Sequence, residues 1–167
     1  ACLGGGLAVA GAVLQALLRN PLAEPYVLGI SAGASTGAVA VVVLGLGGGL
    51  VSLSGGAFFG ALAALLAVAA LASASGGGAE RVILAGVVAS QLFNAITAYV
   101  VTTAANAEQA RGVMFWLLGN LSGVRWPDLA LAAPTVLVAS LVCLFQARAL
   151  DAFTFGADAA MTLGIPV

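Results

Sequence analysis

The chain has 167 residues, of which 62% are hydrophobic and only 7% carry charge, for a net charge of −1. An ordinary soluble domain has about 25% charged residues, so this composition excludes a water-soluble globular protein. It also excludes a disordered chain, which would be polar, and a nucleic-acid-binding protein, which would need clustered Lys or Arg. We therefore predict an all-α polytopic transmembrane helix bundle.

The spans follow from the spacing of the few charges. A spanning helix needs about 20 apolar residues, and the charges divide most of the chain into segments of about this length. The longest charge-free segment, 25–79, exceeds one span and is interrupted by the sequence GLGGG at 45–49. We expect a single membrane domain over 1–167 with five spans, near 1–18, 26–45, 50–74, 82–104 and 129–147.

Five spans place the two ends of the chain on opposite sides of the membrane. Positively charged residues favour the cytoplasmic side. The loops on the side of the C-terminal tail contain Arg19, Arg81 and Arg148, whereas the other loops contain Arg111 and Arg125. This majority favours a cytoplasmic tail.

The first span combines small residues with one amide. Gly4, Ala8 and Ala12 recur every four residues, a spacing that lets helix backbones approach closely. Gln15 needs a hydrogen-bond partner or a wet cavity, because lipid offers neither. It makes a structural interhelical hydrogen bond or belongs to a pathway or gate.

The sequence RNPLAEP at 19–25 separates the first two spans. Asn20 can cap a new helix through its side-chain oxygen, and Pro21 suits the first helical position. Pro25 then interrupts the chain again. The segment is a stiff, defined loop or a plain tight turn at the membrane surface.

The second and third spans carry glycine at four-residue intervals. The second has Gly29, Gly33 and Gly37, and the third has Gly56 and Gly60, followed by Ala64. Each glycine costs about 1 kcal/mol of helix propensity, so close contact with another helix or with a solute is the expected compensation. Both spans belong inside a helix bundle.

The fourth span carries amides on one face. Gln91, Asn94 and Ala98 are spaced i, i+3 and i+7, which places them together on a helix. Two uncompensated amides would cost several kcal/mol in lipid, so this face looks into protein or water. It lines a solute pathway or forms a polar seam between helices.

Two short helices are expected outside the five spans. The segment 109–119, with Phe115 and Trp116, is typical of a helix lying at or dipping into the outer surface, as an outer gate or an anchor. In the tail, Thr154 can cap a helix over 156–163 that ends at a left-handed Gly164. This tail helix is a docking site for a cytoplasmic partner or the start of a further connection.

Several kinds of chemistry are absent from the sequence. It has no His, no Lys and no phosphate-binding glycine loop, so we expect no enzyme activity, no cofactor and no metal site on this chain. Its carboxylates lie in loops, which disfavours a proton relay. We expect Cys2 and Cys143 to pack as apolar residues without a disulfide. Any energy source belongs to another chain. The chain starts at Ala1 without a basic leader, so we expect a fragment or a trimmed chain.

Four ordered blocks carry a family resemblance. They are GLAVAGAVLQALLRNPLAEPYVLGISAGA, RVILAGVVASQLFNAI, FWLLGNLSG and FGADAAMTLGIPV. In this order they resemble the FecCD-type permeases of ABC importers, which carry ferric siderophores, haem and cobalamin. The resemblance covers essentially the whole chain and only the N-terminal half of such a permease.

The resemblance implies a function and its partners. It implies a cell (inner) membrane permease subunit with ten spans in all, paired with a second copy around a central pathway. An extracytoplasmic binding protein would deliver a metal chelate, and a cytoplasmic ATPase would drive alternating access. Asn20 and Leu22 resemble the inner-gate loop, and the fourth span resembles the helix that lines the pathway. The coupling helix that the ATPase moves would be 156–164, with Gly156, Asp158, Ala159, Ala160, Leu163 and Gly164 matching the family pattern.

Two other classes stay open on the residues alone. A secondary carrier or channel fragment could use the same glycine-rich helices, and a membrane scaffold could use the amides only to join helices. The identity of the chelate cannot be read, because the pathway walls of this family are mostly small and apolar.

Overall fold

The computed structural model describes residues 1–46, 52–76, 78–119, 121, 124, 126–156, 161–162 and 164. In this part of the chain the secondary structure is helical throughout, with seven α-helices and one 3-10 helix. The predicted all-α class is confirmed. The chain divides into two compact units, one formed by Ala1–Pro25 with Leu121–Val167 and the other by Tyr26–Asn120. We call them the terminal unit and the central unit.

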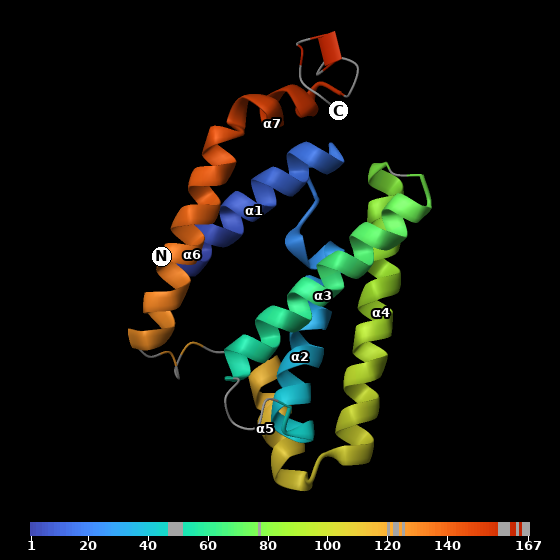
Figure 1. Ribbon diagram of the computed structural model, residues 1–167, viewed down its shortest axis with the longest axis vertical. Coiled ribbons are helices and arrows are strands. Elements are labelled where there is room, and N and C mark those ends of the chain that lie inside the picture. Colours follow the sequence, from blue (N-terminus) through green and yellow to red (C-terminus); the bar gives the residue numbers. More distant parts are fainter. Residues whose placement is uncertain are drawn as a thin grey trace. The chain divides into compact units, whose positions relative to one another are not determined.

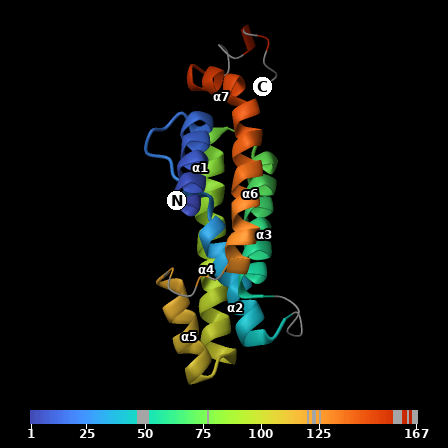
Figure 2. The same cartoon turned by 90° about the vertical axis from the view of Figure 1, so that its left-hand side faces the viewer.

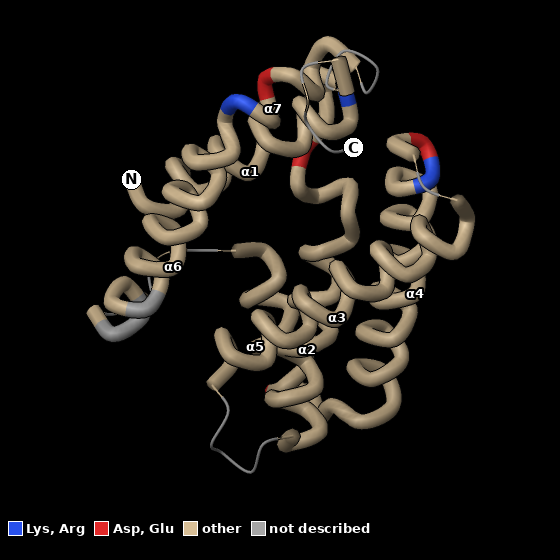
Figure 3. Tube along the Cα trace, turned by 45° about the horizontal axis from the view of Figure 1, so that its top comes forward, with Lys and Arg blue, Asp and Glu red and all other residues tan. Residues whose placement is uncertain are grey.

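The central unit is built around three packed helices, α2 (Ile30–Leu44), α3 (Leu53–Ala74) and α4 (Ala79–Ala104) (Figure 1). A 3-10 turn, η1 (Pro25–Leu28), leads into α2, and the short helix α5 (Ala107–Leu117) follows α4. Helices α2 and α3 carry no charge, and the charges of α4 are confined to its first turn (Figure 3). This unit therefore has the apolar helices that the composition predicts.

Glycines let α2 and α3 touch backbone to backbone. A methyl group added at Gly37 would lie 2.9 Å from the Cα of Gly60, and one added at Gly33 would lie 2.5 Å from the Cβ of Ala64. Neither position has room for a larger residue. The predicted close packing of the glycine stripes is confirmed here, because no side chain separates the two helices.

Gly29 plays a different part from the other glycines of its predicted ladder. It has a φ of 69°, precedes the first turn of α2, and lies against α4, where an added methyl would be 2.9 Å from the Oγ of Ser90. A left-handed conformation is readily adopted only by glycine. Gly29 thus turns the chain from η1 into α2, and it is not part of the α2–α3 contact.

Fewer helices are long enough to span a membrane than the five spans that we expect. Among the described residues, α3 and α4 are long and apolar enough, with 22 and 26 residues. Helix α2 has only 15 residues, about 22 Å at 1.5 Å per residue, because the 3-10 turn η1 and the left-handed Gly29 occupy the start of the predicted span 26–45. Helix α1 (Cys2–Leu18) has 17 residues.

The terminal unit contains α1, α6 (Trp126–Phe145) and α7 (Ala147–Thr154). Its helix pair Ala132–Phe145 and Ala147–Thr154 is bent by 62° and can count as one broken span. Helix α1 lies beside α6 (Figure 2), where Gly6 meets the side chain of Val136. The predicted stripe of Gly4, Ala8 and Ala12 is exposed in this unit, so its close packing is not found.

Candidate functional site

The two amides of α4 lie on the face that the central unit leaves open. Gln91 and Asn94 are both exposed, as are the apolar residues Leu84 and Val87 on the same stripe. The buried residues of α4 are Ala85, Gly86, Ala89 and Thr97. The predicted common face therefore exists, and it points away from α2 and α3.

A buried hydroxyl pair fixes α4 against α2. The Oγ1 atoms of Thr36 and Thr97 are 2.8 Å apart, and Thr36 Oγ1 is also 2.9 Å from the carbonyl oxygen of Phe93. If Thr97 donates to Thr36, Thr36 can donate to Phe93, so each hydroxyl proton has an acceptor. Thr97 is only 8% exposed. The sequence did not reveal this pair, although both threonines lie on glycine- and alanine-rich faces where close helix contact is expected.

The loop 19–25 has a defined backbone but contains no α-helix. The side-chain oxygen of Asn20 accepts a hydrogen bond of 2.9 Å from the N–H of Leu22. The chain is a turn at Pro21 and Leu22, and helical structure resumes only with η1 at Pro25. The prediction that Pro21 begins a helix capped by Asn20 is wrong, because the asparagine caps a turn of its own loop.

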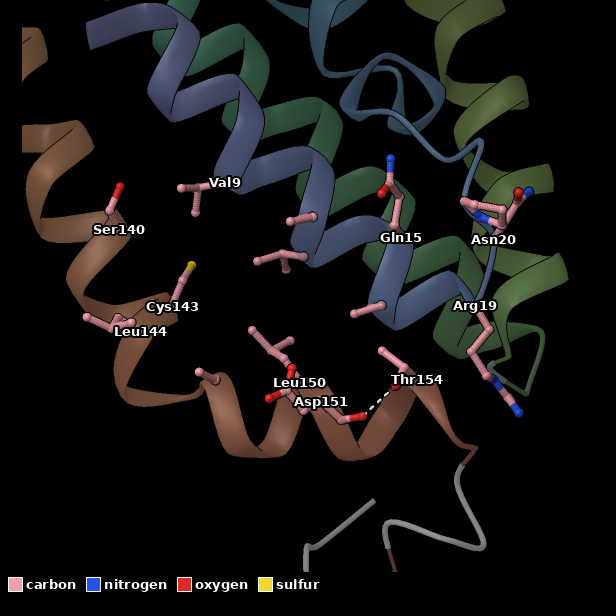
Figure 4. A pocket seen from close by; sticks show the side chains of 15 residues that line it. Val9, Gln15, Arg19, Asn20, Ser140, Cys143, Leu144, Leu150, Asp151 and Thr154 are labelled. Atoms are coloured by element: carbon pink, nitrogen blue, oxygen red, sulfur yellow. Dashed lines mark hydrogen bonds between the residues drawn. The ribbon is translucent and has the colours of Figure 1, made fainter. Parts of the chain in front are cut away.

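Gln15 finds its hydrogen-bond partner in that same loop. Its Nε2 donates to the carbonyl oxygen of Ala23 at 3.3 Å. Figure 4 shows the Gln15 side chain extending from α1 on the side opposite α7. Between α1 and the bent pair α6–α7 lies a cavity of about 600 Å³, into which Val9, Cys143 and Leu150 point.

The predicted coupling segment lies largely outside the described residues. The positions that lie outside the described residues are Asp158, Ala159, Ala160 and Leu163. Of the remaining matched positions, Gly156 has a φ of 111° and Gly164 a φ of 77°. The left-handed conformation predicted for Gly164 is confirmed. The predicted cap is wrong, because Thr154 ends helix α7 and its hydroxyl donates to the carbonyl oxygen of Asp151.

Helix α7 itself was not predicted. It carries Arg148 and Asp151 on its exposed side, while Ala152 is buried and Leu150 half-buried. This amphipathic pattern was readable in the sequence, but we placed the helix of the tail at 156–163. The bend after α6 explains the difference, since Gln146 ends one helical direction and begins another.

The predicted short helix 109–119 corresponds to α5, which begins two residues earlier. Asn106 and Gln109 form a reciprocal capping box, a pattern that fixes helix starts and was present in the sequence. Gln109 also donates from its Nε2 to the carbonyl oxygen of Val42, at the end of α2, at 3.1 Å. Figure 1 shows α5 beside that end of α2.

Metal-ligating residues do not cluster in the described part of the chain, where no group of three or more His, Cys, Asp or Glu side chains could hold an ion. Cys2 and Cys143 are both free thiols. The polar groups that remain for a functional site are the amides of α4 and those of the loop 19–25. These groups can bind or orient a solute.

Comparison with known proteins gives consistent relatives. The chain is 39% identical over 168 residues to the cobalamin import system permease protein BtuC of Halobacterium salinarum. This match covers 100% of this chain and 45% of that protein. It is 35% identical over 169 residues to the hemin transport system permease protein HmuU of Yersinia pestis, covering 99% of this chain and 50% of that protein.

A solved structure shares the fold. It is described as an inward-facing conformation of a metal-chelate type ABC transporter and matches with a TM-score of 0.85 and 26% identity, over 98% of this chain and 52% of that chain. The chain thus spans about half the length of the relatives it matches. The family model that describes the FecCD transport family matches residues 1–167. The chain belongs to the FecCD transport family.

Proposed function

We propose that this chain is the N-terminal half of the permease subunit of an ABC importer, and that the permease moves a metal chelate inward by alternating access. The observation that carries the proposal is the exposed amide face of α4, formed by Gln91 and Asn94 on a helix long enough to span a membrane. Family membership supplies the class of protein.

The physical argument concerns solvation. An amide exposed to hydrocarbon loses its hydrogen bonds to water without gaining others, at a cost of several kcal/mol. Two amides on one stripe of α4 therefore need water, a solute or another helix as a neighbour. In a transport subunit, a water-filled pathway between α4 and a second permease copy meets this need.

The partners follow from what this chain lacks. No phosphate-binding loop occurs in its sequence, so ATP hydrolysis belongs to a separate cytoplasmic subunit. We place the docking site of that ATPase at 156–164, on the cytoplasmic side of the inner membrane. An extracytoplasmic binding protein delivers the cargo to the opposite face. Asn20 and Leu22 form the inner gate of the pathway.

The substrate class is proposed from the relatives. Two of them are named for cobalamin and hemin import, and the structural relative is named for metal chelates. Cobalamin and hemin are bulky metal chelates, each built on a large, mostly apolar macrocycle. The open face of α4 combines the amides of Gln91 and Asn94 with the apolar Leu84 and Val87, so it can contact both polar and apolar surfaces of such a chelate.

The test is uptake by the full-length permease reconstituted with its ATPase and binding protein in proteoliposomes. Asn94→Leu keeps the branched arrangement of the side chain and removes its hydrogen bonds, and we expect a loss of ATP-dependent uptake of about tenfold. Phe58→Leu, on the exposed side of α3, is the matched control. Normal uptake by Asn94→Leu would mean that this amide does not line the pathway and only joins helices, and uptake without ATP would favour a secondary carrier.

A further inference from the structure

We propose that Gln15 is a positioning residue for the inner gate, which holds the loop 19–25 in the shape that presents Leu22. The inference rests on the proposed function, because it assumes that this loop is a gate. Gln15 would then hold the backbone of the loop and would not contact the cargo directly. The hydrogen bonds of the loop carry the argument.

The loop leaves α1 through a strained residue. Arg19 adopts a left-handed conformation, with φ 48° and ψ 39°, and is the single described non-glycine residue with a positive φ. This conformation costs an L-residue about 1 kcal/mol or more, so the surrounding bonds must maintain it. The N–H of Asn20 donates to the backbone carbonyl of Gln15 at 3.2 Å and closes the end of the helix.

Gln15 holds the other end of the loop as well. Its side chain donates to the carbonyl oxygen of Ala23 at 3.3 Å, and the N–H of Ala23 donates to the carbonyl of Asn20 at 3.0 Å. Ala23 is only 5% exposed, so its carbonyl has little access to water. Gln15 therefore contacts the loop twice, through its backbone at Asn20 and through its side chain at Ala23.

The residue between these two anchors faces outward. Leu22 is 85% exposed, although its own N–H is bonded to the Asn20 side chain at 2.9 Å. A leucine on a flexible loop would turn inward to bury its apolar surface. Here the backbone is fixed at residues 20, 22 and 23, so the side chain stays presented. That is the arrangement expected of a residue that must meet another surface.

The experiment is a double-mutant cycle in the full-length permease reconstituted with its ATPase and binding protein. The variants are Gln15→Leu, Leu22→Ala and the pair, and the readout is passive leak of the cargo together with ATP-dependent uptake. We expect each single variant, Gln15→Leu or Leu22→Ala, to change the rate of passive leak about fivefold. The double variant should change that rate no further. A residue that merely stabilises the helix would add its effect to that of Leu22→Ala.

A matched control and a second measurement keep the test decisive. Gln146→Leu makes the same exchange in the terminal unit at an exposed glutamine, and we expect it to leave leak and uptake unchanged. Should Gln15→Leu fail to assemble, Gln15→Asn retains the amide but is too short to reach Ala23. In either variant, a cysteine at Leu22 should react with a soluble maleimide at a rate altered about fivefold.

The outcomes separate the inference from the proposed function. If Leu22→Ala changes neither leak nor uptake, the loop is not a gate and the proposed gate is wrong. If Leu22→Ala has its effect but Gln15→Leu has none, the gate stands and the positioning role of Gln15 is overturned. Additive effects in the pair would likewise overturn it.

Discussion

The two units use glycine in opposite ways. In the central unit, an added methyl at Gly37 or Gly86 would lie within about 3 Å of backbone atoms of the neighbouring element. In the terminal unit, Gly4, Gly5 and Gly11 of α1 have open space around them. The same residue type thus allows backbone contact in one unit and leaves a free helix face in the other.

A stripe of small residues in a membrane chain does not by itself identify a helix contact. A stripe shows that a close approach is possible, but the partner must come from elsewhere in the sequence. For α2 the partner is α3, which carries its own glycines at Gly56 and Gly60. The exposed stripe of α1 has no such partner among the described residues of the terminal unit.

The largest effect should follow from Gly37→Val. The valine cannot fit between α2 and α3, because even a methyl would lie 2.9 Å from the Cα of Gly60. We expect a loss of about 3 kcal/mol or more in the free energy of unfolding, measured by denaturant titration of the full-length permease in detergent. A stability equal to the parent protein would mean that the two helices are not in backbone contact.

A smaller effect should follow from Gln109→Leu. This change removes one half of the capping box of α5 and the hydrogen bond to Val42. We expect a cost of about 1 to 2 kcal/mol, concentrated in α5. Hydrogen exchange of the amides 107–117 should become faster while that of α3 stays the same. Unchanged exchange in α5 would show that the capping box and the hydrogen bond to Val42 do not stabilise this helix.

Thr97→Val tests the hydroxyl pair between α2 and α4. Valine has the shape of threonine without its hydroxyl, so packing is preserved and the hydrogen bond to Thr36 is lost. We expect about 0.6 kcal/mol of destabilisation, the size usual for such bonds in membrane proteins. Thr102→Val is the control, since that hydroxyl bonds only to carbonyls of its own helix. Equal effects in both variants would remove the special role of the pair.

The smallest effect, of opposite sign, is expected for Gly5→Ala. The added methyl has nothing within 4 Å, and alanine favours the helix by up to about 1 kcal/mol. The variant should therefore be as stable as the parent or slightly more stable in thermal unfolding. A clear loss of stability would mean that another helix of the full-length permease contacts α1 backbone to backbone at Gly5.

The sequence was most informative where apolar length and spacing decide the structure. The predicted spans 50–74 and 82–104 agree closely with α3 and α4, and the spacing of Gln91 and Asn94 correctly placed both on one face. Interruptions were harder to predict. The shortening of α2 depends on the left-handed Gly29, and a glycine in a helical pattern does not reveal its φ.

The candidate site was predicted less completely than the fold. The hydrogen bond between Gln15 and Ala23 joins residues eight apart in the sequence, on either side of a helix end. The hydrogen bond between Thr36 and Thr97 joins residues 61 apart. Contacts of this kind depend on tertiary geometry, which periodicity does not describe. The sequence could show that the Gln15 amide needs a partner but not where the partner lies.

We propose that the amide face of α4 lines a water-filled pathway. The most direct test is thiol labelling of Asn94→Cys in the full-length permease, with Cys2 and Cys143 replaced by serine and with Phe58→Cys, at an exposed apolar position of α3, as the control. A charged, membrane-impermeant reagent needs a thiolate in contact with water. We predict that Asn94→Cys reacts at least about tenfold faster than Phe58→Cys. Equal and negligible reaction at both positions, in every nucleotide state, would contradict the account.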